Sequence, residues 1–212
     1  QLFDMLHSMR QFDDLTYVHS VNVALIASIL GQWLKFSEKD IRILTISGLL
    51  HDIGKIMIPN EILTKPGKLT VAEYNIMKQH VNFGYEKVKN QNIDIRIKEA
   101  CLLHHEKCDG TGYPFGLKSD HIPAVAKIIA IADVYDAMTS ARVYRGALCP
   151  FEVIDTMYKD AFTKFEPEYI LPFLKNVASS YINNDVRLSD GRIGKVVLIN
   201  ENALSLPIVQ CE

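Results

Sequence analysis

The chain has 212 residues, and its length fits one globular domain with a small appendage. A hydrophobic content of 48% can bury a large core, which excludes a disordered chain. The formal net charge of −2 excludes the basic excess of a nucleic-acid scaffold, so we expect no nucleic-acid polymer as partner.

The four cysteines are free of any CxxC pair or disulfide-framework spacing; they are Cys101, Cys108, Cys149 and Cys211. Reduced thiols of this kind are typical of cytosolic proteins, so we expect a cytoplasmic domain. The sequence opens at Gln1 without an initiator methionine, which predicts a piece of a longer protein. A regulatory or sensor domain, and any membrane anchor of the full-length protein, would lie outside this piece.

Apolar residues recur at helical spacing along most of the chain. Leu2, Met5, Leu6 and Met9 share one face of a first helix, which we expect to be a connector and a homodimer contact. Ordinary packing of this helix onto the domain is the alternative. Further helices are predicted at residues 16–34, 37–50, 69–80, 95–105, 124–139, 151–162 and 168–181, two of them with start signals at Ser37 and at a Thr70–Glu73 capping box.

The tail has a different pattern. Residues 186–199 are rich in β-branched side chains around Asp190-Gly191, which is a hairpin turn signal. We therefore predict a short two-stranded ribbon after the helices. The expected division is a connector helix at residues 1–13, a helical domain at 14–182 and a ribbon extension at 183–212.

Five of the seven histidines lie within or at the ends of apolar helical segments: His19, His51, His80, His104 and His105. A buried imidazole needs a polar partner, so each one alone is best interpreted as a hydrogen-bonded core residue. Five together, with an aspartate beside one of them, favour a metal site instead.

The segment LLHDIGKI places Asp52 and Lys55 at a helix end. The two oxygens of Asp52 can bridge two cations while imidazoles complete each coordination shell. Lys55 lies just beyond Gly54, where its charge can meet an anion at the same site. The alternative for this segment is a helix cap followed by a solvated lysine.

A second carboxylate, Asp133, follows an apolar run in IIAIADVYDAMTS and is expected to be buried, and buried carboxylates are paired or bind metal. Asp136, one turn further, is either a partner of a ligand or an exposed structural residue. Arg142 and Arg145 are spaced to bind phosphate oxygens through their guanidinium groups, with a charged surface turn as the alternative.

The order of these segments resembles the HD-GYP family, a branch of the HD metal-dependent phosphohydrolases. His19, HDIGK, His80, HHEKCDGTGYP and IADVYDAMTSARVYR occur in the family's order over roughly residues 16–173. The resemblance implies an all-α, HD-type helical bundle, here with a short C-terminal β-ribbon. It implies a phosphodiesterase that hydrolyses a cyclic dinucleotide, most often cyclic di-GMP to pGpG and in some members to GMP, by attack of a metal-bridging hydroxide.

The resemblance also assigns roles to residues. It implies two divalent metal ions, iron or manganese. His19, His51, Asp52 and Asp133 would hold one ion, and Asp52 would bridge to a second ion held by His80, His104 and His105. Asp52 and Lys55 would be the catalytic residues, while Lys55, Arg142, Arg145 and Tyr113 would contact the substrate. Glu106 is expected to orient a histidine or the loop that follows it, rather than to bind metal.

Several alternatives remain at this point. One is an HD phosphohydrolase acting on mononucleotides or guanosine tetraphosphate, and another is a non-catalytic cyclic-dinucleotide-binding signalling module. Cyclic GMP-AMP or cyclic di-AMP would present the same phosphates as cyclic di-GMP. Family members with three metal ions have a glutamate four residues before the first histidine ligand, and Leu15 holds that position here, so we predict two ions.

Overall fold

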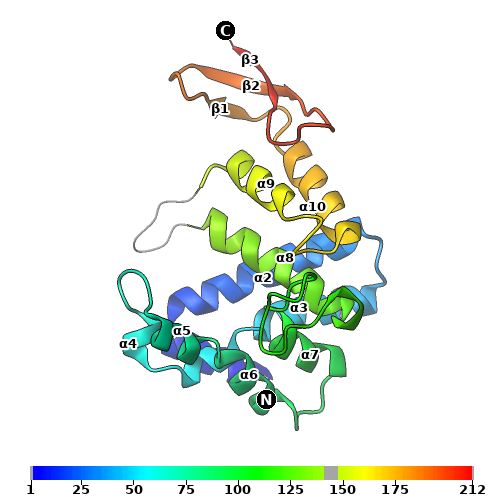
Figure 1. Cartoon of the computed structure of the whole chain (residues 1–212). Helices are drawn as coiled ribbons and strands as arrows, with labels where there is room; N and C mark the ends of the chain where they lie inside the picture. The colour runs from blue at the N-terminus through cyan, green and yellow to red at the C-terminus, as the bar shows by residue number, and fades with distance from the viewer. Residues whose placement is uncertain (1, 141–147, 212) are drawn as a thin grey trace.

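The structure is a computed structural model that describes residues 2–140 and 148–211. A bundle of helices forms the body, and a small antiparallel sheet lies beyond α10 at the end of the molecule opposite α6 (Figure 1). The mainly helical fold predicted from the sequence is confirmed. The elements are α1 (Leu2–Phe12), α2 (Asp14–Trp33), α3 (Glu38–Leu50), η1 (Ile53–Met57), α4 (Asn60–Leu63), α5 (Val71–Met77), α6 (His80–Val88), α7 (Ile95–Leu103), η2 (Ser119–His121), α8 (Ala124–Thr139), α9 (Pro150–Lys159), α10 (Pro167–Ser179), β1 (Asp185–Arg187), β2 (Ile193–Leu198) and β3 (Ile208–Cys211).

Helices α2, α3 and α8 form the centre of the bundle, with α2 packed against both of the others. A Cβ atom on Gly48 of α3 would lie 2.5 Å from the Ala24 Cα of α2, so glycine is what allows these two backbones to touch. Within the described residues, α2 has the length and composition of a membrane span. Its Val23, Ala27 and Leu30 are fully buried in the core, which explains that apolar composition.

The first helix packs on the domain. Met9 is buried, and Met5 and Leu6 are partly buried against the same core, while α1 contacts α2 and η1. Met5, Leu6 and Met9 therefore pack onto the domain itself, which was the alternative to a homodimer contact. The homodimer contact stays a prediction.

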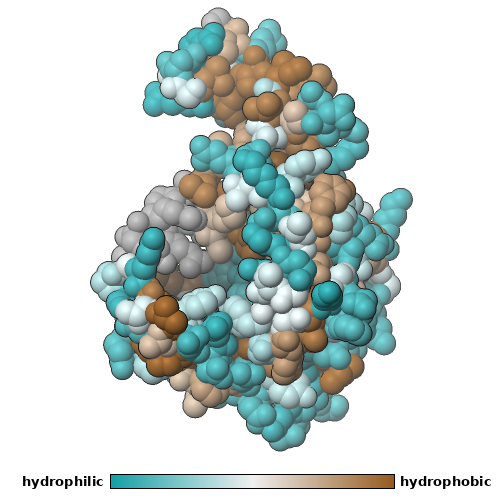
Figure 2. Space-filling model, in the orientation of Figure 1, coloured by the Kyte–Doolittle hydropathy of each residue, from teal (hydrophilic) through white to brown (hydrophobic). Residues whose placement is uncertain are grey.

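The C-terminal sheet has the order β1-β2-β3, so the prediction of a two-stranded ribbon was wrong by one strand. The hairpin at Asp190-Gly191 is present, with Gly191 at φ 91°. The missed strand β3 pairs antiparallel with β2 across an irregularity between Val196 and Leu198. Val196 and Leu204 anchor the sheet in the core, and apolar side chains also gather on its outer surface (Figure 2).

Candidate metal centre

The segment that carries Asp52 is fixed by close backbone packing. Helix α3 ends at Leu50, His51 caps it, and Asp52 leads into η1. A Cβ atom on Gly54 would collide with the His80 carbonyl oxygen and the Gly84 nitrogen, both in α6. The absence of a side chain at Gly54 therefore sets how closely Asp52 approaches His80.

Three buried histidines share one arrangement. Their Nδ1 atoms lie at hydrogen-bond distance from backbone carbonyl oxygens: His51 from Gly48 at 2.7 Å, His80 from Met77 at 2.8 Å and His104 from Ala100 at 2.9 Å. A carbonyl oxygen only accepts, so each Nδ1 carries the proton and each Nε2 has a free lone pair. Such outer hydrogen bonds orient metal-ligating imidazoles in proteins.

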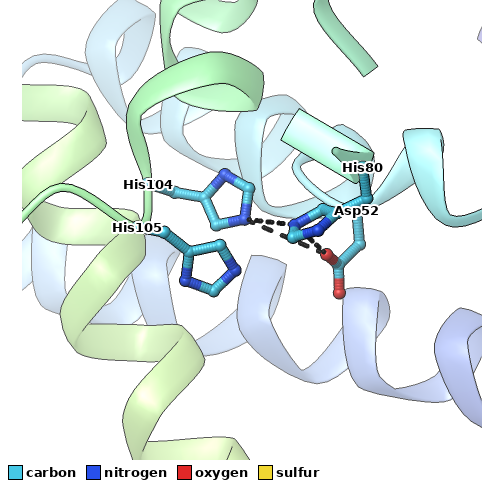
Figure 3. A group of neighbouring side chains, drawn as sticks. All are labelled: Asp52, His80, His104 and His105. Carbon is cyan, nitrogen blue, oxygen red and sulfur yellow. Dashed lines mark hydrogen bonds and ion pairs between the residues drawn. The ribbon is translucent and has the colours of Figure 1, made fainter. Parts of the chain in front are cut away.

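The Nε2 atoms of these histidines converge on Asp52, and Figure 3 shows His80 and His104 on one side of its carboxylate. Its Oδ1 atom lies 3.4 Å from His80 Nε2 and 3.9 Å from His104 Nε2. Its Oδ2 atom lies 3.3 Å from His51 Nε2 and 3.6 Å from His19 Nε2. The two oxygens of one carboxylate thus face two different groups of imidazoles, which is the geometry expected of a bridging ligand.

The side of the site formed by α2 and α8 is a hydrogen-bonded chain. His19 Nε2 lies 2.9 Å from Asp133 Oδ1, and His19 Nδ1 lies 2.6 Å from Asp136 Oδ2. The other oxygen of Asp136 accepts from Asn22 Nδ2 and Ser140 Oγ, both at 2.9 Å. Asp136 is therefore a buried partner of His19, and the exposed structural alternative for it is wrong.

The loop after α7 covers the opposite side. His105 Nδ1 lies 3.9 Å from Asp133 Oδ2, and the His105 ring stacks on Tyr113 with centroids 4.7 Å apart. Glu106 is buried, and its carboxylate accepts from the backbone N–H groups of Phe115 at 2.7 Å and Leu117 at 2.9 Å. Glu106 therefore orients the loop, as expected, and Tyr113, which is part of that loop, stacks on the candidate ligand His105.

Burial and neighbouring charges set the protonation of these groups. Burial lowers the pKa of His104 well below its usual value, assisted by the adjacent His105, and burial lowers the pKa of His105 to about 3. Burial of Asp52 acts to raise its pKa, but Lys55 and His51 outweigh burial and hold the pKa far below the usual range. His104 and His105 are thus neutral and Asp52 is ionised, which are the forms that bind cations.

His19 is the exception. Burial acts to lower its pKa, but hydrogen bonds to Asp133 and Asp136 outweigh burial and raise the pKa to about 9. The carboxylates that favour a proton on this ring also favour a metal cation in the proton's place, because both interact with the same negative charge.

Two buried polar atoms at the centre support a bound cation. His51 Nε2 and Asp52 Oδ1 are buried and have no hydrogen-bond partner, an arrangement that is costly unless something else satisfies them. Two groups of side chains could each hold an ion: Asp52, His80, His104 and His105, and His19, His51 and Asp52. Both groups contain Asp52, so the residues present fit a pair of divalent ions that share it.

Comparison with known proteins identifies the family. The family model described as "HD domain" matches residues 5–169. The chain belongs to the HD domain family. Together with the HDIGK and GYP segments, this match confirms the family predicted from the sequence.

Curated relatives and solved structures carry similar HD domains. The chain is 36% identical over 203 residues to Cyclic di-GMP phosphodiesterase PA4108 of Pseudomonas aeruginosa, covering 95% of this chain and 49% of that protein. It is 36% identical over 158 residues to 3'3'-cGAMP-specific phosphodiesterase 2 of Vibrio cholerae, covering 73% and 30%. The HD domain of the phosphodiesterase PgpH of L. monocytogenes, solved in complex with cyclic-di-AMP, superposes with a TM-score of 0.64 at 18% identity, covering 84% and 95%. The chain therefore spans half or less of the length of these two curated relatives, and the PgpH likeness concerns the fold.

All seven predicted ligand side chains lie in this HD-domain centre, and Lys55 Nζ lies 2.5 Å from Asp52 Oδ2. Arg142 and Arg145 lie outside the described residues. Sequence reasoning missed Asn22, which could have been found because it lies one helical turn after His19 on the same face of α2. It also missed the close approach at Gly54, which no local pattern signals.

Proposed function

We propose that this chain is a metal-dependent phosphodiesterase that hydrolyses a cyclic dinucleotide, with cyclic di-GMP as its substrate and pGpG, then GMP, as products. The observation that carries the proposal is Asp52, a buried carboxylate whose two oxygens face two separate groups of imidazoles. This is the arrangement of a two-metal hydrolytic site, and a purely structural ion needs no shared carboxylate.

Seven side chains would hold the metal pair. His19, His51 and Asp133 would bind one ion, His80, His104 and His105 the other, and Asp52 both. When bound, such a pair supplies an activated water and neutralises charge on the phosphoryl oxygens. The mixture of imidazole and carboxylate donors suits iron or manganese better than a structural zinc.

The chain's own residues have distinct tasks in this reaction. Lys55, with its side chain 23% exposed, extends from the buried Asp52 toward solvent, where its ammonium group can stabilise negative charge that gathers on the phosphate. Asp136 holds His19 in one orientation, and Glu106 holds the loop that places Tyr113 over His105. Arg142 and Arg145 would bind the phosphates of the dinucleotide.

Cyclic di-GMP is the favoured substrate because the relative that covers 95% of this chain is named for it. The Vibrio cholerae relative is named for cyclic GMP-AMP, and the PgpH HD domain was solved with cyclic-di-AMP; the phosphates of these dinucleotides are the same. We further propose a cytoplasmic domain that works under a regulatory or sensor part of a longer protein, as a homodimer through α1.

The test is turnover by protein purified without oxygen or chelators and analysed for metal. We expect iron or manganese in the protein, and hydrolysis of cyclic di-GMP faster than of cyclic GMP-AMP or cyclic di-AMP. Treatment with a chelator should abolish the activity and re-addition of the metal should restore it. Loaded protein that binds all three dinucleotides without hydrolysing any would instead establish a binding module.

A further inference from the structure

Lys78 lies at the rim of the metal centre between two tyrosine rings. Its Nζ atom is 5.2 Å from the ring centroid of Tyr74 and 5.9 Å from that of Tyr113, both within cation–π range. Tyr113 in turn stacks on His105. A short sequence of contacts therefore leads from a candidate metal ligand out to this ammonium group.

The rim is held in place by the start of α5. Thr70 and Glu73 form a capping box, and the Glu73 carboxylate also accepts from Lys65 Nζ at 2.7 and 2.8 Å. This acidic group is thus committed to other partners than Lys78. Tyr74 is 48% exposed, so the cation between the two rings borders solvent as well as the site.

Lys78 and Lys55 differ in their partners. Among the described residues, no carboxylate lies within ion-pair distance of Lys78 Nζ, whereas Lys55 is already bound to Asp52. The rings of Tyr74 and Tyr113 hold the ammonium group by cation–π contacts. A phosphate that binds Lys78 therefore does not have to displace a carboxylate of the described residues. An ammonium group that is held in place but has no carboxylate partner among the described residues is suited to bind an anionic ligand.

We propose that Lys78 binds the phosphate of the cyclic dinucleotide that is not being hydrolysed; this assignment rests on the proposed function. A cyclic dinucleotide has two phosphodiesters in one ring, so when one reaches the metal pair the other must lie away from the centre. That second phosphate keeps its full negative charge, and a lysine binds phosphate as a compact point charge. We assign this second phosphate to Lys78, whose ammonium group lies at the rim between Tyr74 and Tyr113.

This role has a kinetic signature. The charge on the second phosphate is the same in the bound substrate and in the transition state, so Lys78 stabilises both equally. Removing such uniform binding raises KM and leaves kcat unchanged. A group acting on the reacting phosphate would lower kcat instead.

The experiment compares Lys78→Met, which keeps most of the apolar stem, with Lys78→Arg, which keeps the charge. The matched control is Lys159→Met on α9, where the lysine side chain is 72% exposed and pairs only with Asp155 among the described residues. Each protein is assayed with cyclic di-GMP and with bis(4-nitrophenyl) phosphate, a diester that has a single phosphate. Metal content and thermal melting establish that each variant is folded and loaded.

For Lys78→Met we expect KM for cyclic di-GMP to rise at least about tenfold, the loss of one charge-assisted contact, at unchanged kcat and metal content. Kinetics with the single-phosphate diester should not change, and Lys78→Arg should recover most of the KM. A KM within twofold of wild type, or an equal loss on both substrates, would overturn the assignment of Lys78. Wild-type protein that cleaves the single-phosphate diester but no cyclic dinucleotide would overturn the proposed function itself.

Discussion

Gly54→Ala is the substitution that most directly tests how the fold sets the metal centre. The added methyl group would occupy space now held by the His80 carbonyl and the Gly84 nitrogen, well inside the 3.0 Å that real Cβ contacts respect. Backbone atoms lie on the other side of this contact, so no side chain can rotate away. The Asp52 segment and α6 must therefore separate by roughly 1 Å to restore normal contacts.

That separation acts on the centre itself, because Asp52 and His80 lie on opposite sides of the contact and are now 3.4 Å apart. Overpacking of this kind costs about 1–3 kcal/mol of stability, which lowers the melting temperature by roughly 2–12 °C for a chain of this size. A displacement of about 1 Å in a catalytic site can cost about a hundredfold in rate. We expect Gly54→Ala to lose metal and at least that much activity.

Gly84→Ala is the matched control across the same contact. A Cβ atom there would meet the Gly54 nitrogen at 3.4 Å and the Ile53 side chain at 3.6 Å, which are ordinary contacts. Since alanine is favoured over glycine within a helix by about 1 kcal/mol, this variant should be as stable as wild type or more so. Metal analysis, melting and turnover of both variants complete the test. If Gly54→Ala kept wild-type metal content and rate, this packing would not set the centre.

Three further substitutions separate the roles of other residues. Asp52→Ala should remove metal and hydrolysis together, because it removes the shared carboxylate, while circular dichroism still shows the helical fold; undiminished hydrolysis would end the two-metal proposal. Arg142→Ala should raise KM for the cyclic dinucleotide at unchanged metal content, because arginine has no lone pair for a cation, and loss of metal would contradict this role. Glu106→Gln leaves one of the Phe115 and Leu117 N–H groups facing an NH₂ group, so we expect a loss of about 1–3 kcal/mol in unfolding free energy at unchanged metal content; unaltered melting would show that the loop does not depend on this carboxylate.

The parts of the fold that local sequence signals specify were predictable. The capping box at Thr70 and the N-cap at Ser37 are present. The helices predicted at residues 16–34, 37–50, 95–105 and 124–139 form close to those bounds, as α2, α3, α7 and α8. The break between α5 and α6 was not predicted, since neither glycine nor proline marks it. The expected helix at residues 69–80 ends at Met77, and α6, which begins at His80, was not predicted. At this break the His80 ring has the Met77 carbonyl oxygen as its partner.

Long-range relations could not be predicted in the same way. Strand β3 joins β2 only through pairing across intervening turns, so its existence depends on the fold rather than on a hairpin signal. The candidate ligands were predictable as a set because their motifs are separate and ordered. Their grouping around the two oxygens of Asp52 came from the family resemblance, and Lys78 came from neither, because its two aromatic partners lie on different segments.

The predicted number of metal ions depends on which carboxylates could hold a third ion. Leu15, at the position where a third-ion glutamate would stand, is 63% exposed and has no donor atom. Asp13 caps α2, with its carboxylate accepting from the Thr16 N–H at 2.9 Å, and Asp14 lies exposed in the first turn. Glu106 is committed to the loop. Asp13 and Glu106 therefore already have hydrogen-bond partners, and Asp14 is exposed in the first turn of α2, so none of the three takes the place of the missing glutamate.

We accordingly expect about two metal ions per chain from elemental analysis of protein purified without chelators, the number of a two-metal hydrolase. Leu15→Glu is the informative variant, because it places a carboxylate one helical turn before His19, at a position that is 63% exposed. A rise toward three ions in this variant alone would show that the missing carboxylate limits the wild type to two. Three tightly held ions in the wild type would refute the prediction, and the ligand would then have to be sought among Asp14 and Glu106.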